Sequence, residues 1–302
     1  MSGNVTTRAS ARLVTAAMIT ACALEISTPA AQMPVRVLRD ITYASVGGRE
    51  LQLDLHLPVG VGNPPLMVWV HGGAWREGSR TSVRTEFVRN GFATASVGYR
   101  LSTESRFPAM VHDIKAAIRF LRAKGADYGY QADRIAISGD SAGAHLAALV
   151  GVSNGVAELE GEVGSHRDRS SAVQSIVAYY PATNLTTILA QSTPFGLNVR
   201  MPALQLLLGD LPDRVPGLAR LASATTHVDG SDPPLLIFHG DQDPQMPINQ
   251  SHELHGAYEA LKPDGDLIVV HGGAHGGDVF YEGDRLDRAL AFLRRTLGVA
   301  AP

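Results

Sequence analysis

The fold is decided by residues 134–150, which read Arg134-Ile-Ala-Ile-Ser-Gly-Asp-Ser-Ala-Gly-Ala-His-Leu-Ala-Ala-Leu-Val150. This run begins like a buried strand and ends in alanine and leucine, which favour a helix. The five residues between them, Gly139-Asp-Ser-Ala-Gly143, fit the pattern G-x-S-x-G. Between a strand and a helix, this pattern predicts a strained turn that exposes the serine hydroxyl. Ser141 is therefore a candidate nucleophile.

A second match, Gly151-Val-Ser-Asn-Gly155, lies at the far end of the same predicted helix. No strand-like run precedes it, and Asn154-Gly155 is typical of a helix C-terminus. We therefore interpret Ser153 as part of a helix cap rather than as a second nucleophile.

Short apolar runs recur on both sides of this turn, with helical stretches between them; the clearest helix is 110–123. The alternating run 51–57 predicts an edge strand that pairs with 41–45 across a glycine turn. The remaining predicted strands are 66–70, 93–97, 135–138, 176–180, 235–238 and 267–270. Runs of this kind are typical of parallel strands that are covered on both faces. The sequence thus predicts an α/β fold with about eight strands in a mostly parallel sheet.

Residues 184–232 interrupt the alternation of strands and helices. They contain proline, glycine and the apolar cluster 202–208 before the predicted strand 235–238. We predict a small lid insertion here, and a helix packed on the sheet between long loops is the alternative.

Length and composition limit the classes of function. A chain of 302 residues with 45% hydrophobic and 18% charged residues is long enough for one large globular domain, predicted at 33–302. The formal net charge is −3, and no segment is dense in lysine and arginine. Phosphate binding needs clustered cations, so we expect no nucleic-acid partner. A small neutral molecule is the expected ligand.

Residues 1–32 resemble an export signal or a lipoprotein leader. Arg8 and Arg12 precede the apolar stretch 13–24, and that stretch is too short for a stable membrane span. Ile19-Thr-Ala-Cys22 resembles a bacterial lipobox, whereas 28–31 would suit ordinary signal cleavage. We expect a periplasmic or secreted protein, with lipidated Cys22 as the one possible membrane tether. Because Cys22 is the only cysteine, no intrachain disulfide can form.

A serine nucleophile needs a histidine to accept its proton and an acid to hold that histidine. Two loops downstream of Ser141 follow late predicted strands. One contains His271-Gly-Gly-Ala-His275, whose glycines give His275 the freedom to reach over the sheet, while His271 abuts the strand and is expected to be held within the fold. The other contains Asp241 and Asp243, and spacing alone leaves both eligible as the acid.

A glycine-rich loop, His71-Gly-Gly-Ala-Trp75, follows the predicted strand 66–70. Its small residues leave backbone N–H groups free to point at a developing oxyanion, and it resembles the H-G-G-G oxyanion loop. We predict Gly73, Ala74 and Ala142 as the donors and His71 as an organiser of the loop. The patterns of phosphate-binding loops do not occur in this position.

A set of motifs from about Leu51 to Leu297 resembles the α/β-hydrolase superfamily. The motifs are His71-Gly-Gly-Ala-Trp75, Tyr99-Arg-Leu-Ser102, Phe107-Pro-Ala109, Asp113, Ala116-Ala-Ile-Arg-Phe-Leu121, Gly139-Asp-Ser-Ala-Gly-Ala-His-Leu-Ala147, Pro233-Pro-Leu-Leu-Ile-Phe-His-Gly-Asp-Gln-Asp243 and Gly273-Ala-His275. The similarity is to the esterase/lipase branch, with its hormone-sensitive-lipase-like and bacterial feruloyl-esterase-like groups. Ala74 departs from H-G-G-G and points to the feruloyl-esterase-like group.

The resemblance implies a catalytic triad of Ser141, His275 and Asp243, and it favours Asp243 over Asp241. It implies the same three oxyanion donors as the loop pattern. Three further predictions concern other residues. Trp75 and Tyr99 would flank the substrate pocket, with packing beside the sheet as the alternative for each. Asp113 and Arg100 would form a buried polar pair, and Trp69 would lie in the core.

The sequence therefore predicts a serine carboxylesterase for small to medium esters that uses no metal or organic cofactor. An arylformamidase-like amidohydrolase shares the same motifs, although an export signal favours the esterase. A non-catalytic hydrolase-fold binding protein is the rival from another class, and the filled triad positions weigh against it. The natural ester and the oligomeric state are left open.

Overall fold

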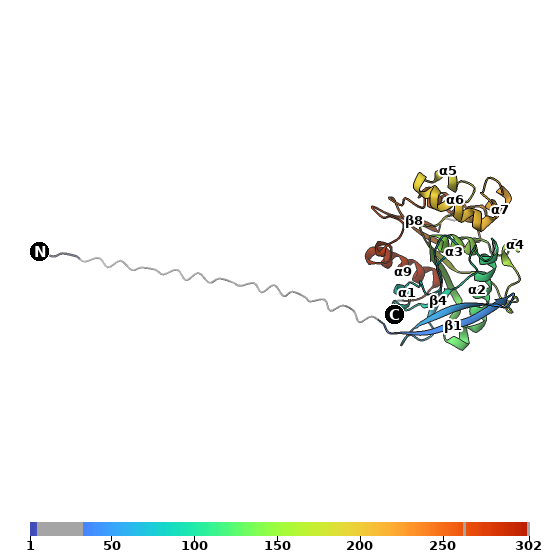
Figure 1. The fold of residues 1–302 in the computed structure, drawn as a ribbon. Coiled ribbons are helices and arrows are strands. Elements are labelled where there is room, and N and C mark those ends of the chain that lie inside the picture. Colours follow the sequence, from blue (N-terminus) through green and yellow to red (C-terminus); the bar gives the residue numbers. More distant parts are fainter. Residues whose placement is uncertain (5–32, 262–263, 301–302) are drawn as a thin grey trace. The chain divides into compact units, whose positions relative to one another are not determined.

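The structure, a computed structural model, describes residues 1–4, 33–261 and 264–300. The predicted leader, including Cys22, lies outside the described residues except for its first four. The strands among the described residues are β1 (Val35–Val46), β2 (Arg49–Pro58), β3 (Pro65–Val70), β4 (Ala93–Val97), β5 (Gln131–Asp140), β6 (Ser175–Tyr179), β7 (Leu235–Gly240) and β8 (Gly265–Val270). Here they form one eight-stranded sheet in the order β1-β2-β4-β3-β5-β6-β7-β8 (Figure 1).

The predicted sheet is confirmed, including its antiparallel edge. β1 and β2 pair across the turn at Gly47 and Gly48, and β2 also runs antiparallel to β4. All other neighbouring strands are parallel. Because β3, β5, β7 and β8 run the same way, the loops that follow them meet at one end of the sheet.

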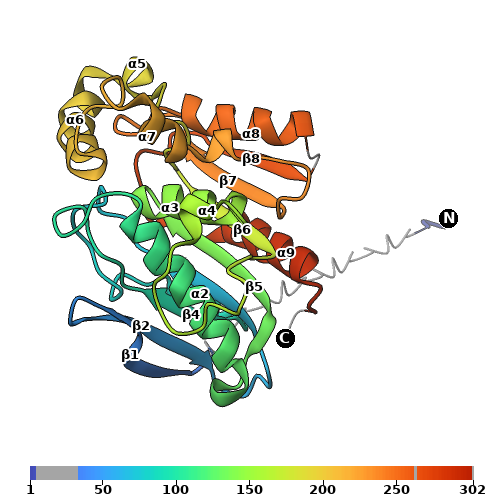
Figure 2. The same cartoon turned by 90° about the vertical axis from the view of Figure 1, so that its right-hand side faces the viewer.

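Helices cover both faces of the sheet. Their bounds are α1 (Thr85–Arg89), α2 (Ala109–Tyr128), α3 (Ala142–Val152), α4 (Ala157–Glu160), α5 (Ile188–Gln191), α6 (Pro194–Leu208), α7 (Pro216–Leu221), α8 (Asn249–Leu261) and α9 (Gly283–Leu297). Figure 2 shows α2 and α3 on one side of the central strands and α9 on the other. The two apolar clusters correspond to these faces, and the predicted core residue Trp69 lies in the cluster that includes α9. Within the described residues, no helix is long and apolar enough to cross a membrane.

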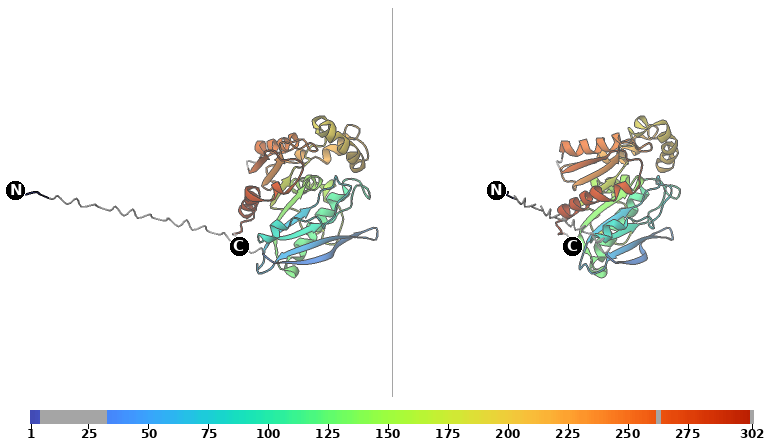
Figure 3. Two further views of the ribbon diagram at one scale, coloured as in Figure 1. Left: turned by 60° about the vertical axis from the view of Figure 1, so that its left-hand side comes forward. Right: turned by 90° about the vertical axis from the view of Figure 1, so that its left-hand side faces the viewer.

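The segment 184–232 contains α5, α6, α7 and a short 3-10 helix between β6 and β7. Figure 3 shows these helices together at the end of the domain opposite the β1–β2 hairpin. The longest of them, α6, begins at the N-cap Thr193, whose hydroxyl accepts the N–H of Gly196 at 3.0 Å. One face of α6 is buried, and it is formed by Ala203, Leu204, Leu207 and Leu208. The segment therefore packs on the domain as a helical insertion, and its role as a lid remains a prediction.

The predicted pair of Arg100 and Asp113 is confirmed. Arg100 Nη2 donates to Asp113 Oδ1 at 2.7 Å and its Nε donates to Oδ2 at 2.9 Å, while the Arg100 backbone N–H also donates to Oδ2. Asp113 is completely buried. This carboxylate therefore fixes the segment after β4 to α2.

We expect Asp113→Ala to lower the free energy of unfolding by about 3–5 kcal/mol, because it leaves a guanidinium without its buried partner. The measurement is urea unfolding of the two proteins. Asp127→Ala is the matched control, since Asp127 pairs with Lys124 on the exposed surface of the same helix and should matter little. Loss of catalytic activity in a fully stable Asp113→Ala protein would contradict a purely structural role.

Candidate active site

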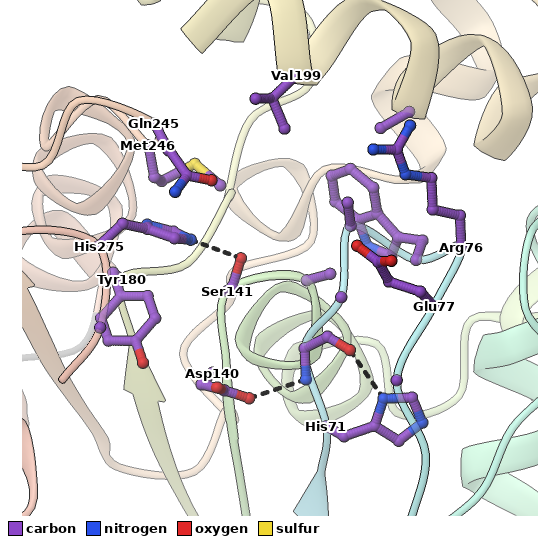
Figure 4. Close-up of a pocket in the computed structure, with 18 of the residues that line it drawn as sticks. His71, Arg76, Glu77, Asp140, Ser141, Tyr180, Val199, Gln245, Met246 and His275 are labelled. Atoms are coloured by element: carbon purple, nitrogen blue, oxygen red, sulfur yellow. Dashed lines mark hydrogen bonds between the residues drawn. The ribbon is translucent and has the colours of Figure 1, made fainter. Parts of the chain in front are cut away.

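Four loops at the carboxyl ends of β3, β5, β7 and β8 surround a pocket of about 450 Å³. Its wall includes the loop 71–78, Ser141, His275 and residues of α6. Figure 4 shows His275 pointing at Ser141 with Asp140 nearby. The predicted insertion thus contributes to the pocket through Val199, Arg200 and Ala203.

Ser141 lies at the turn between β5 and α3, with φ 53° and ψ −118°. Residues other than glycine rarely adopt this backbone conformation. The N–H of Ser141 helps to hold it by donating to Tyr179 O at 2.9 Å. Gly143 is required beside it, because a Cβ there would lie 2.1 Å from Val70 O. The strain predicted from the sequence is therefore present, and it directs the serine hydroxyl into the pocket.

The structure brings together Ser141, His275 and Asp243. His275 Nε2 lies 2.8 Å from Ser141 Oγ, and His275 Nδ1 lies 2.6 Å from Asp243 Oδ2. A carboxylate can only accept here, so Nδ1 carries the proton and Nε2 is free to accept from the serine. The imidazole is thus oriented as a base for the hydroxyl.

The environment of Asp243 favours its ionised form. Burial opposes ionisation, but the imidazole of His239, whose Nε2 lies 3.5 Å from Oδ2, and the hydrogen bond from His275 outweigh it and hold the pKa of Asp243 below its usual range. The backbone N–H groups of Gln245 and Met246 each donate to Asp243 Oδ1 at 2.8 Å. The acid is therefore held by donors on both oxygens.

A second aspartate–histidine pair lies one step away on the same two loops. Asp241 Oδ2 accepts from His271 Nδ1 at 2.9 Å, and Asp241 Oδ1 accepts from Gly272 N at 2.8 Å. The His271 side chain is 87% exposed, so the prediction that it is held within the fold is wrong. The glycines after β8 let the chain turn outward at His271 before it returns to the pocket at His275.

The loop after β3 contains Gly73 and Ala74, two of the three residues predicted as oxyanion donors, and the third, Ala142, begins α3 after β5. Gly73, Ala74 and Trp75 have φ values of 111°, 50° and 60°, an unusual run of left-handed residues. Within the described part of the chain, no hydrogen-bond partner occupies the N–H groups of Gly73, Ala74 or Ala142. Their free donors are what an oxyanion site requires. Gly73 is also sterically required, because a Cβ there would lie 2.2 Å from Glu77 O.

Asp140 supports this loop, a role that the sequence analysis did not assign. Its Oδ1 accepts the N–H of Gly72 at 2.8 Å, and burial raises the pKa of its carboxyl despite that bond. The bond joins the turn of Ser141 to the glycine-rich loop after β3. The signal in the sequence was an acidic side chain directly before the candidate nucleophile.

The aromatic residues predicted to flank the pocket behave differently from each other. Trp75 lines the pocket, but the residue is only 2% exposed and its Nε1–H donates to His145 Nδ1 at 2.9 Å. Burial lowers the pKa of His145 to about 4, so the ring stays neutral and accepts this bond. Trp75 is therefore mainly a fixed part of the loop.

Tyr99 is not among the described residues that line the pocket, and its prediction is corrected. Its ring stacks on His71 with 4.4 Å between centroids, and its hydroxyl donates to His71 O at 2.8 Å. His71 Nδ1 in turn donates to Gly72 O at 2.8 Å, as expected of a loop organiser. Ser153, in the second G-x-S-x-G match, is the C-cap of α3, as interpreted.

The topology, the turn of Ser141 and the aligned serine, histidine and aspartate define an α/β-hydrolase with the geometry of a serine hydrolase. The profile of the BD-FAE family matches residues 53–258. The chain belongs to this family of α/β-hydrolase esterases.

Known proteins give the same classification. The chain is 34% identical over 240 residues to the esterase LipQ of Mycobacterium tuberculosis, covering 76% of this chain and 54% of that protein. It spans about half the length of the first curated relatives it matches. A truncated carbohydrate esterase from gut microbiota superposes with a TM-score of 0.78 and 27% identity, covering 89% of this chain and 99% of that one. Esterase 2 of Thermogutta terrifontis superposes with a TM-score of 0.69 and 26% identity, covering 90% and 95%.

Proposed function

We propose that this protein is a serine carboxylesterase that hydrolyses small to medium carboxylic esters. The observation that carries the proposal is the continuous line of contacts from Ser141 Oγ through His275 to the buried Asp243. In the proposed reaction, Ser141 Oγ attacks the ester carbonyl while His275 Nε2 takes its proton. The proton then passes to the leaving alkoxide, which departs as the alcohol. Water attacks the acyl-Ser141 intermediate by the same route, releases the acid and restores the serine.

Negative charge develops on the former carbonyl oxygen in both steps. The free N–H groups of Gly73, Ala74 and Ala142 are proposed to receive it, each contributing about 3 kcal/mol to transition-state stabilisation. Asp243 is proposed to stay ionised while His275 carries a positive charge, which agrees with its lowered pKa. The esterase names of the relatives support the same reaction class.

The test is hydrolysis of p-nitrophenyl acetate, butyrate, octanoate and palmitate, with N-formylkynurenine as an amide substrate. Ester hydrolysis that depends on acyl length is expected, because the pocket is of limited size. Faster turnover of the formamide than of every ester would favour the amidohydrolase. A folded protein that turns over no substrate of either kind would favour a binding role instead.

A glycine substitution tests the proposed oxyanion site. We expect Gly73→Ala to lower kcat by about 10²- to 10³-fold, because its Cβ would collide with Glu77 O and displace one N–H donor. Gly62→Ala is the control, since a Cβ at Gly62 meets no atom within 4 Å. Equal kcat values in the two variants would mean that the Gly73 N–H is not an oxyanion donor.

A further inference from the structure

The loop that carries Asp243 is held from outside by other parts of the chain. Asp243 Oδ1 accepts two backbone N–H groups, those of Gln245 and Met246. Each N–H belongs to a rigid planar peptide group whose carbonyl lies on the preceding residue. Those carbonyls are Pro244 O and Gln245 O, so whatever holds these two oxygens also fixes the two donors to Asp243.

Both carbonyls accept hydrogen bonds from the segment of α6. The hydroxyl of Thr193, the N-cap of α6, donates to Pro244 O at 2.8 Å. Arg200, in the middle of α6, donates from Nη2 to Gln245 O. Gly196 allows the helix to lie this close, because a Cβ there would be 3.0 Å from Gln245 O. The two peptide groups are therefore held between Asp243 and α6.

Arg200 is buried without a carboxylate partner in the part of the chain that the structure describes, which is unusual for an arginine whose only role is packing. It is 4% exposed, and among the described residues no carboxylate lies within ion-pair distance of it. Its Nη1 contacts Met246 Sδ at 3.1 Å, and its Nε has no partner in the described part of the chain. Burial lowers the pKa of Arg200 to about 10, while the negative charge of Asp243 opposes this shift. The guanidinium is therefore buried against the loop of the acid, with a charge that the acid attracts.

From these contacts we infer that Arg200 is a positioning residue through which α6 sets the orientation of Asp243 toward His275. This inference rests on the proposed function, because it assigns the role through the triad. Arg200 fixes the Gln245–Met246 peptide, that peptide fixes Asp243 Oδ1, and Asp243 Oδ2 then meets His275 at 2.6 Å. Figure 4 shows Gln245 and Met246 beside His275. In this interpretation the insertion both lines the pocket and orients the triad, because the position of α6 and the geometry of the triad depend on each other.

Arg200→Met tests this role, since methionine keeps much of the apolar stem but removes the donors and the charge. We expect kcat for p-nitrophenyl acetate to fall about 10- to 100-fold, the size of effect that a small misplacement produces, with KM changed less than threefold. Arg200→Lys, which keeps the charge and a donor, should recover part of the loss. The matched control is Gln205→Met, on the exposed face of the same helix, which should keep the wild-type kcat.

A spectroscopic readout separates positioning from general damage. The proton that His275 Nδ1 donates to Asp243 should give a downfield proton NMR signal, identified by its loss in His275→Gln. We expect this signal to shift or broaden in Arg200→Met and to persist in Gln205→Met, with urea unfolding measured on both. If Arg200→Met does not fold, the lysine variant carries the same comparison.

The experiments distinguish failure of the positioning role from failure of the proposed esterase function. An unchanged kcat in Arg200→Met, or a fall in kcat with an unchanged His275 signal, would overturn the positioning role and leave the esterase proposal intact. A wild-type protein that hydrolyses no ester would overturn the proposed function itself, and the positioning role with it.

Discussion

Ser141→Ala should lower kcat for every ester substrate by at least about 10⁴-fold, which is the largest effect expected for this protein. The substitution removes the oxygen that His275 Nε2 contacts at 2.8 Å, and no acyl-enzyme can then form. The fold should survive, because the turn is held by backbone contacts such as Ser141 N to Tyr179 O. The measurement is kcat at saturating p-nitrophenyl butyrate, with circular dichroism to compare the two folds.

The second G-x-S-x-G match provides the control for Ser141→Ala. Ser153 is buried at the C-terminus of α3, and its hydroxyl has no partner in the described part of the chain. Ser153→Ala should therefore keep the wild-type kcat. Activity above about 1% in Ser141→Ala, or a comparable loss in Ser153→Ala, would mean that the nucleophile has been misassigned.

Much of the fold was predictable because it depends on local patterns. The apolar runs mark six of the eight strands in the described sheet, and the alternation in 51–57 marks the edge hairpin that supplies the other two. The context of Ser141 separated it from Ser153 for the same reason, since a strand must precede the turn. Such patterns indicate whether one or both faces of a strand or helix are buried, because residue type and spacing determine which side chains face the core.

The details of the site were less predictable because they depend on the paths of loops. His271 and His275 are four residues apart, yet one side chain is 87% exposed and the other 12% exposed. No periodicity encodes that difference, which arises from the turn that the glycines allow. Tyr99 was misplaced for a related reason, because an aromatic residue at the end of a strand can point to the pocket or beneath it.

Arg200 shows a signal that was present but not interpreted. It is the only charged residue in α6, a helix otherwise made of apolar and uncharged polar residues. A lone arginine in such a segment either points to solvent or finds buried acceptors, and the sequence does not say which. The acceptors are the backbone of the 243–246 loop, which lies more than 40 positions away along the chain.

Asp243→Asn should lower kcat by about 10⁴-fold, whereas Asp241→Asn should leave it nearly unchanged. Both residues hold a histidine on the same pair of loops, so spacing cannot separate them. Geometry does, because only Asp243 reaches the imidazole that contacts Ser141. An amide at 243 would present a donor or a neutral acceptor to His275 Nδ1, and it would favour the tautomer that cannot accept the serine proton.

The two substitutions are alike in chemistry and differ only in position, so each is the control for the other. Their kcat values should be compared at a pH where both proteins are folded, with urea unfolding as the check. A large loss in Asp241→Asn with little loss in Asp243→Asn would transfer the role of the acid to the exposed pair. Equal and small losses would mean that His275 needs no carboxylate for its role. The catalytic role of Asp243 would then be wrong, although its side chain is buried and accepts two backbone N–H groups.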